Sequence, residues 1–158
     1  MTFDQIPVPG NAQAKLYLGP FGAIRNREDI ESLDTPFTFV VNVAPTDVSH
    51  EGIVGHNDTF ESLDVLLQFF KGQSYVHYRL EEVLPVIWDK LMNGESVFVH
   101  CQLGITRSAT LIAALLMKYC NLDYRSAVNH VTSYRHIVDI SGQHRALLIQ
   151  YGEFLKKN

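Results

Sequence analysis

One stretch of the chain, residues 97–108, decides the fold, and it reads Val97-Phe98-Val99-His100-Cys101-Gln102-Leu103-Gly104-Ile105-Thr106-Arg107-Ser108. Its first three residues are β-branched or aromatic, which is typical of a buried strand. The apolar residues after Arg107 predict a helix, so a short loop joins the two. A loop at a helix N-terminus presents several backbone N–H groups and the positive end of the helix dipole. The sequence therefore predicts a site for an anion the size of phosphate.

Two side chains add reactive chemistry to this expected anion site. Arg107 carries a planar guanidinium group that can bind two oxygens of one anion at once. Cys101 lies at the other end of the loop, where the helix N-terminus and Arg107 both stabilise a thiolate. We therefore expect the pKa of Cys101 to lie well below the value of about 8.5 for a free thiol, which makes the sulfur nucleophilic at neutral pH.

Strands and helices alternate along the rest of the chain. Strands are predicted at 16–19, 37–44 and 63–70, although the last of these could also form a helix. Helices are predicted at 23–33 and at 80–91, where Pro85 would mark a kink or the first turn, with a break at 71–74 before it. Three more helices are expected at 108–119, at 124–134 with Asp123 as the N-cap, and from Ser141 onward. Residues 45–59 show no periodicity.

This alternation predicts one α/β domain over residues 15–158, with a central, mostly parallel sheet flanked by helices. Residues 1–14 are expected to form an N-terminal arm with little to bury beyond Phe3 and Ile6. The segment 108–119 is apolar nearly all round, so its helix should lie in the centre of the molecule. The reactive loop should follow the carboxyl end of one strand, in the crevice where such sheets bind ligands.

Composition limits the function classes. The net charge is −4, which argues against nucleic-acid and anionic membrane partners, and no apolar run is long enough to span a bilayer. Two cysteines do not make a disulfide framework, so we expect a cytoplasmic or nuclear protein. Cys120 should lie about 20 Å along the helix from the loop and remain a free thiol. The histidines show no metal-ligand spacing, so no metal and no cofactor are expected.

The string His100-Cys101-x-x-Gly104-x-x-Arg107-Ser108 resembles the active-site signature of the cysteine-dependent protein tyrosine phosphatases. The following residues, 108–112, are similar to the small, atypical dual-specificity branch, and residues 16–19 resemble its entry strand. The resemblance implies hydrolysis of phosphotyrosine and of phosphoserine or phosphothreonine through a cysteinyl-phosphate on Cys101. It also implies that Ser108 stabilises the sulfur as a leaving group and that His100 orients the loop. The phosphate would be bound by Gln102, Leu103, Gly104, Ile105, Thr106 and Arg107.

The same resemblance calls for a general acid, an aspartate on a loop before the cysteine. No carboxylate occurs between Val65 and Leu80, so the candidate is Asp64, which lies 37 residues before Cys101. Its alternative role is that of a solvated residue at a strand start. Asp58 is a poorer candidate, and Glu81 and Glu82 are expected to be solvated on a helix surface.

Two alternatives to a phosphatase remain open. Without a general acid the chain would be a phosphoresidue-binding pseudophosphatase or scaffold, although a binding protein needs neither Cys101 nor Ser108. A sulfur-transfer or arsenate-reducing enzyme fits less well, because those folds place the loop near the N-terminus. In the resembled family, members that act on inositol lipids usually carry lysines in this loop. The resemblance therefore implies that the uncharged residues 102, 103 and 105 favour a phosphoprotein substrate, with a kinase as one candidate. The sequence gives no signal for an oligomeric state.

Overall fold

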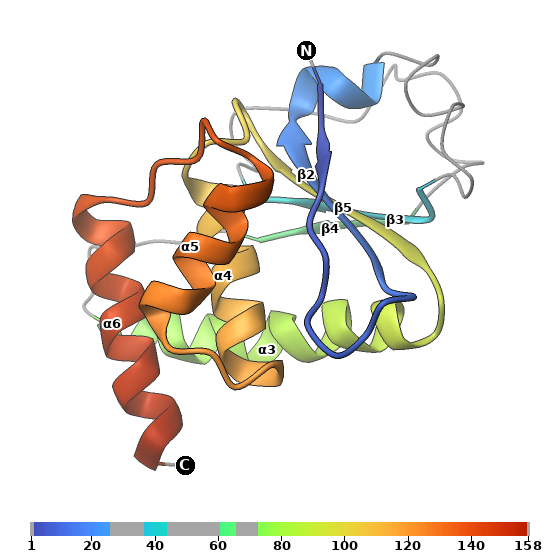
Figure 1. The fold of residues 1–158 in the computed structure, drawn as a ribbon. Coiled ribbons are helices and arrows are strands. Elements are labelled where there is room, and N and C mark those ends of the chain that lie inside the picture. The colour runs from blue at the N-terminus through green and yellow to red at the C-terminus, as the bar shows by residue number, and fades with distance from the viewer. Residues whose placement is uncertain (1, 26–36, 44–60, 66–72, 158) are drawn as a thin grey trace.

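A five-stranded sheet carries the reactive loop at its carboxyl edge, with the long helices gathered on one side of the sheet (Figure 1). The computed structural model describes residues 2–25, 37–43, 61–65 and 73–157. The sheet order is β1-β2-β5-β3-β4, in which β1 runs antiparallel to β2 and all other neighbours are parallel. The strands are β1 (Asp4–Gln5), β2 (Lys15–Pro20), β3 (Phe39–Asn42), β4 (Glu61–Asp64) and β5 (Ser96–Cys101).

The helices follow the sequence signals at most of their ends. They are the short 3-10 helix η1 (Phe21–Arg25), α3 (Gln73–Met92), α4 (Arg107–Tyr119), α5 (Tyr124–Tyr134) and α6 (Gly142–Lys157). Asp123 caps α5 as predicted, because its side chain accepts a hydrogen bond from the backbone N–H of Ser126. Gly94 follows α3 with a φ of 83°, a conformation that favours glycine after a helix.

Strand β5 lies between β2 and β3 and is buried on both faces. Val97 and Val99 belong to the larger core on the helical side, whereas Phe98 belongs to an aromatic core on the opposite side. Phe98 stacks there on Phe37, with ring centroids 4.8 Å apart. Because both faces are covered, all six residues of β5 are buried, and this packing positions the strand end that carries Cys101.

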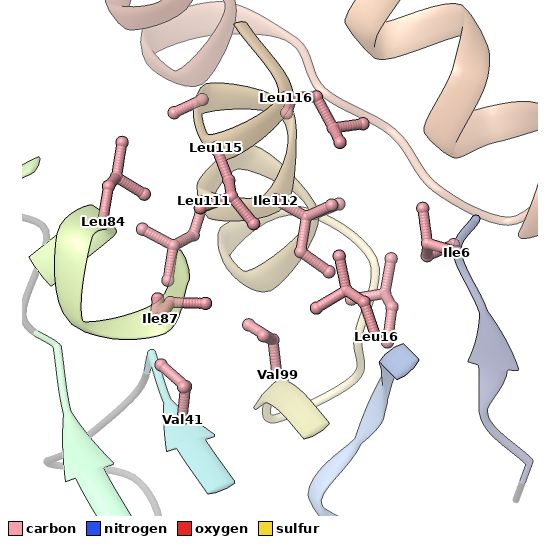
Figure 2. Packing of buried hydrophobic residues seen from close by; sticks show 14 of the residues in the cluster. Ile6, Leu16, Val41, Leu84, Ile87, Val99, Leu111, Ile112, Leu115 and Leu116 are labelled. Atoms are coloured by element: carbon pink, nitrogen blue, oxygen red, sulfur yellow. The ribbon is translucent and has the colours of Figure 1, made fainter. Parts of the chain in front are cut away.

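Helix α4 is the centre of the helical layer. All of its residues from Ser108 to Met117 are buried. Figure 2 shows Leu111, Ile112 and Leu115 of this helix pointing toward residues of the sheet and of α3. Since burial of one such side chain contributes about 1.5–3 kcal/mol, this packing fixes the start of α4, and with it Arg107 and Ser108, against the sheet.

The predicted fold class is confirmed, and several boundaries differ. The segment 63–70 is a strand rather than a helix over its described part, and this strand, Glu61–Asp64, begins earlier than predicted. Residues 66–70 lie outside the described residues. The predicted break at 71–74 is too long, because α3 begins at Gln73. Pro85 lies well inside α3 rather than in its first turn. Proline inside a helix costs about 3 kcal/mol, and burial of Leu84 and Ile87 on the core side of α3 outweighs that cost.

The predicted N-terminal arm, residues 1–14, contributes a strand to the sheet. Its strand β1 pairs Asp4 with Leu18 and covers the edge of β2. Val8 and Ala14 are buried together with Ile6, so the expectation that this segment has little to bury was wrong. A strand as short as β1 gives no periodic signal, which is why the pattern missed it.

Two further expectations concern residues outside the described part of the chain. The helix predicted for 23–33 appears as η1 up to Arg25, and residues 26–36 are not described. The irregular segment predicted at 45–59 lies wholly outside the described residues. Within the described residues, no helix is both long and apolar enough to cross a membrane.

Candidate active site

The loop between β5 and α4 is pressed against the end of strand β2. Gly104, in the middle of the loop, has a φ of 68°, a backbone conformation that is strained for a residue with a side chain. A Cβ atom built on Gly104 would lie 2.3 Å from the carbonyl carbon of Gly19 and 2.7 Å from the nitrogen of Pro20. Glycine is therefore required here both by the backbone conformation and by the close approach of two chain segments.

The Cys101 sulfur lies inside this loop among hydrogen-bond donors. Its Sγ is 3.1 Å from the Ser108 hydroxyl oxygen, and the backbone N–H of Gly104 donates to it over 3.3 Å. Burial alone raises the pKa of the thiol and is the largest single influence. The hydrogen bonds from the hydroxyl and backbone of Ser108 and from Gly104, together with the charge of Arg107, outweigh it. The pKa of Cys101 is thus lowered, as the sequence predicted.

An open pocket of about 570 Å³ lies in front of the sulfur. The described residues that line it are Cys101, Gln102, Leu103, Ile105, Thr106 and Arg107. Arg107 is the only cation in this set, and its charge also contributes, after burial, to the lowered pKa of His144 at the start of α6. The structure therefore brings Cys101, Arg107 and the predicted phosphate-binding residues other than Gly104 to one pocket, with Ser108 beside the sulfur.

Two contacts from the turn after α5 hold the outer edge of the loop. The hydroxyl of Thr106 donates to the carbonyl of Asp139 over 2.8 Å, and the N–H of Asp139 donates to the carbonyl of Ile105 over 3.0 Å. This turn comprises residues 136–140. Its contacts place the turn beside Ile105 and Thr106, two residues that line the pocket.

Arg135, at the C-terminal end of α5, is a site residue whose position the sequence did not reveal. Its Nε donates to the carbonyl of Gly104 over 2.8 Å and its Nη2 to that of Leu103 over 3.4 Å. The residue is 5% exposed. An arginine just after a helix gives a weak sequence signal, because most such residues are solvated.

His100 lies behind the loop rather than in the pocket. The ring is fully buried, stacks on Phe98 and packs near Phe21. Its Nδ1 is 3.3 Å from the carbonyl oxygen of Cys101. This contact is to the main chain of the residue that carries the sulfur.

Asp64, the predicted general acid, ends strand β4 at the same sheet edge as the loop. It pairs with Asn42, which in turn pairs with His100, so two inter-strand spacings, about 10 Å, separate its backbone from β5. Asp58 lies outside the described residues.

The other two carboxylates considered for this role are far from the pocket. Glu81 was expected to be solvated, but it forms an ion pair with Lys118 and accepts a hydrogen bond from the Tyr151 hydroxyl. Lys118 is about 16 Å along α4 from Arg107, so Glu81 cannot reach the pocket. Glu82 pairs with Arg79 on the surface of α3.

Cys120 follows the last turn of α4, and both cysteines are free thiols. Burial raises the pKa of Cys120, which is opposite to the shift at Cys101. Among the described residues, no group of three or more histidine, cysteine, aspartate or glutamate side chains is placed to hold a metal ion.

Curated relatives of this chain are phosphatases. Dual specificity protein phosphatase 26 of Homo sapiens is 27% identical over 145 residues, which cover 84% of this chain and 62% of that protein. Dual specificity protein phosphatase 1 of Arabidopsis thaliana is 29% identical over 136 residues, which cover 86% of this chain and 65% of that protein. The chain thus spans less than two thirds of the length of these relatives.

Solved structures share the fold. A leucine rich repeat and phosphatase domain containing protein from Entamoeba histolytica superposes with a TM-score of 0.77 at 18% identity, covering 99% of this chain and 94% of that one. Human DUSP28 superposes with a TM-score of 0.70 at 22% identity, covering 89% of this chain and 90% of that one. The family model described as "Dual specificity phosphatase, catalytic domain" matches residues 16–154. The chain therefore belongs to the dual specificity phosphatase family.

Proposed function

We propose that this chain is a protein phosphatase that hydrolyses phosphotyrosine and phosphoserine or phosphothreonine through a cysteinyl-phosphate. The observation that carries the proposal is the sulfur of Cys101, bonded by Ser108 and Gly104 and facing a pocket that Arg107 lines. A thiolate beside donors for a tetrahedral anion is suited to phosphoryl transfer. The names of the curated relatives support the same reaction class.

In the first step the thiolate of Cys101 attacks phosphorus, so a sulfur–phosphorus bond forms while the ester oxygen–phosphorus bond breaks. The backbone N–H groups of the loop and the guanidinium of Arg107 bind the three remaining phosphoryl oxygens, on which charge is concentrated. The departing oxygen of the substrate takes a proton from a general acid, for which we propose Asp64. General acid assistance of this kind contributes about 10² to 10⁴ in rate.

In the second step a water molecule attacks the cysteinyl-phosphate and releases inorganic phosphate. The sulfur–phosphorus bond breaks, and its electron pair returns to Cys101 as a thiolate. Ser108 donates its hydroxyl proton in a hydrogen bond to that sulfur, 3.1 Å away, and so stabilises the leaving group. Asp64, deprotonated in the first step, takes a proton from the water.

A phosphorylated protein, for example a kinase, is the substrate class we propose. Arg107 is the only cation among the described residues that line the pocket, and Gln102, Leu103 and Ile105 add no charge. A single guanidinium suits one phosphate, whereas a multiply phosphorylated headgroup would call for further cations. The net charge of −4 does not favour nucleic acid. We also propose a cytoplasmic or nuclear location, where free thiols such as Cys101 and Cys120 persist.

One observation favours a second candidate function. The described residues that line the pocket include no carboxylate, so a proton donor has to come from elsewhere. If Asp64 does not supply it, the chain binds a phosphorylated side chain and turns it over slowly. The second candidate is therefore a phosphoresidue-binding protein or scaffold.

Hydrolysis of an aryl phosphate compared with that of a phosphothreonine peptide separates these functions. A phosphatase with its acid cleaves both, a binding protein with a weak active site cleaves only the aryl phosphate, and a pure binding protein cleaves neither. Cys101→Ser should abolish turnover and retain vanadate binding, and acid-quenched wild type should carry one phosphoryl group on Cys101. Turnover that persists in Cys101→Ser would refute the nucleophile.

A further inference from the structure

The guanidinium of Arg135 lies behind the phosphate-binding loop and has acceptors on several sides. Its Nε and Nη2 donate to the carbonyls of Gly104 and Leu103, and its Nη1 donates to Asp4 over 2.9 Å and to the carbonyl of Thr2 over 3.2 Å. A cation this deeply buried is stable only when such partners are provided. Arg135 therefore joins the N-terminal segment to the loop.

The contacts of Arg135 fix the direction of two peptide groups. In a trans peptide the C=O and the following N–H point in opposite directions. Because Arg135 binds the carbonyl of Leu103 from outside, the N–H of Gly104 points the other way, and it is this N–H that donates to the sulfur of Cys101. The bond to the carbonyl of Gly104 turns the N–H of Ile105 toward the pocket in the same manner.

Asp4 completes the arrangement from strand β1. Its carboxylate pairs with Nη1 of Arg135, while its backbone pairs with Leu18 in the sheet. Asp4 is 41% exposed, so the carboxylate is the accessible end of an otherwise buried chain of contacts. The N-terminal strand is therefore connected to the Cys101 sulfur through Asp4, Arg135 and the Leu103–Gly104 peptide.

We propose that Arg135, held by Asp4, is a positioning residue that aims the Gly104 and Ile105 N–H groups at the sulfur and at the bound oxyanion. The N-terminal strand thereby becomes part of the catalytic apparatus. The effect of this positioning on turnover rests on the proposed phosphatase function, but its effects on the ionisation of Cys101 and on oxyanion affinity do not. A purely structural Arg135 would instead stabilise the end of α5, where its own N–H donates to the carbonyl of Val131.

The test compares Arg135→Lys and Asp4→Asn with matched substitutions elsewhere. Arg125→Lys changes an exposed arginine of the same helix, and Asp89→Asn changes an exposed aspartate of α3. Two readouts need no turnover: the pH midpoint of Cys101 alkylation by iodoacetamide, and the affinity for vanadate. Thermal unfolding and the separate kcat and KM for an aryl phosphate complete the set.

We expect Arg135→Lys to raise the alkylation midpoint and to weaken vanadate binding about tenfold, because an ammonium cannot hold both carbonyls and Asp4 together. Asp4→Asn should act in the same direction with a smaller effect, and it keeps the test decisive if Arg135→Lys does not fold. Both controls should match wild type. If folded Arg135→Lys and Asp4→Asn lose only thermal stability, with midpoint and vanadate affinity unchanged, the positioning role is wrong. If wild type has no turnover yet both readouts shift, the phosphatase proposal fails and the positioning role stands.

Discussion

Substitution of Gly104 by alanine tests whether the loop geometry makes the site. The added methyl group meets backbone atoms, at 2.3 Å from the Gly19 carbonyl carbon and 2.5 Å from its oxygen. Backbone cannot rotate away as a side-chain end would, so either the loop or the end of β2 has to move. Gly94→Ala provides the matched control, since Gly94 also has a positive φ, 83°, but its Cβ would meet nothing within 4 Å.

The two substitutions share the same conformational penalty and differ in the collision. A left-handed conformation costs an L-residue roughly 1–2 kcal/mol, so the free energy of unfolding of both variants falls by this amount. Overpacking adds about 1–3 kcal/mol at Gly104 alone. Replacing glycine by alanine also lowers the conformational entropy of the unfolded chain, and this effect is common to both variants and cancels in their comparison. We therefore expect Gly104→Ala to be less stable than Gly94→Ala by about 1–3 kcal/mol, unless the loop shifts to relieve the collision.

A shifted loop leaves its own signature. The N–H of Gly104 would leave the sulfur of Cys101, and loss of one such donor lowers kcat by about 10² or more. Urea unfolding of both variants, with aryl phosphate kinetics and the Cys101 alkylation midpoint, distinguishes the two responses. If Gly104→Ala has the same unfolding free energy as Gly94→Ala and the same kcat and alkylation midpoint as wild type, the close approach at Gly104 has no role in the site.

Three further predictions concern the proposed catalytic residues. Ser108→Ala removes a hydrogen bond that favours the thiolate, so the pH midpoint of Cys101 alkylation should rise, and an unchanged midpoint would contradict the role of the 3.1 Å contact. In rapid-quench kinetics of this variant, a burst of aryl product should precede slow hydrolysis of the cysteinyl-phosphate. Arg107→Lys keeps the positive charge but loses the planar guanidinium, so its vanadate affinity and its kcat/KM should be as low as those of Arg107→Ala. Titration and steady-state kinetics measure the two quantities, and wild-type values in Arg107→Lys would mean that charge alone suffices. Asp64 must be protonated to act as the acid, so kcat of the wild type should fall on the basic limb of the pH profile. Asp64→Asn should flatten that limb and the control Asp89→Asn should keep it, whereas identical profiles for wild type and Asp64→Asn would remove Asp64 from the mechanism.

The parts of the fold that could be predicted from the sequence depend on patterns among residues that are close together in the chain. The strand before Cys101 and the apolar helix after Arg107 are periodic or continuous apolar runs, and both form where expected. Asp123 as the cap of α5 follows from its local hydrogen bond to Ser126. The order of strand, loop and helix fixed the position of Cys101 and Arg107 relative to each other, so these two residues were within reach of sequence reasoning.

The parts that escaped prediction depend on contacts between distant segments. Glu81 is drawn out of solvent by Lys118 and Tyr151, which lie on two other helices. Pro85 stays inside α3 because the buried side chains around it outweigh its missing N–H. Arg135 and Asp4 are far apart in the chain and meet only once the sheet and α5 are assembled. No local pattern encodes such pairs, because each residue taken alone is an ordinary surface type.

The contacts of its main chain explain how a loop with one arginine can bind an anion. Every carbonyl oxygen from His100 to Thr106 has a hydrogen-bonding partner, in chain order the N–H of Val43, the His100 ring, the N–H of Phe21, Nη2 and Nε of Arg135, the N–H of Asp139, and Thr110. These partners come from strands, turns and helices on different sides of the loop. Because each trans peptide sends its N–H opposite to its C=O, the contact of Arg135 with the carbonyl of Leu103 directs the N–H of Gly104 to the sulfur, and we infer that other outer partners act on the loop in the same way. The proposed anion site therefore depends on the surrounding fold, and losing an outer partner such as Arg135 should weaken oxyanion binding without changing a residue that touches the anion.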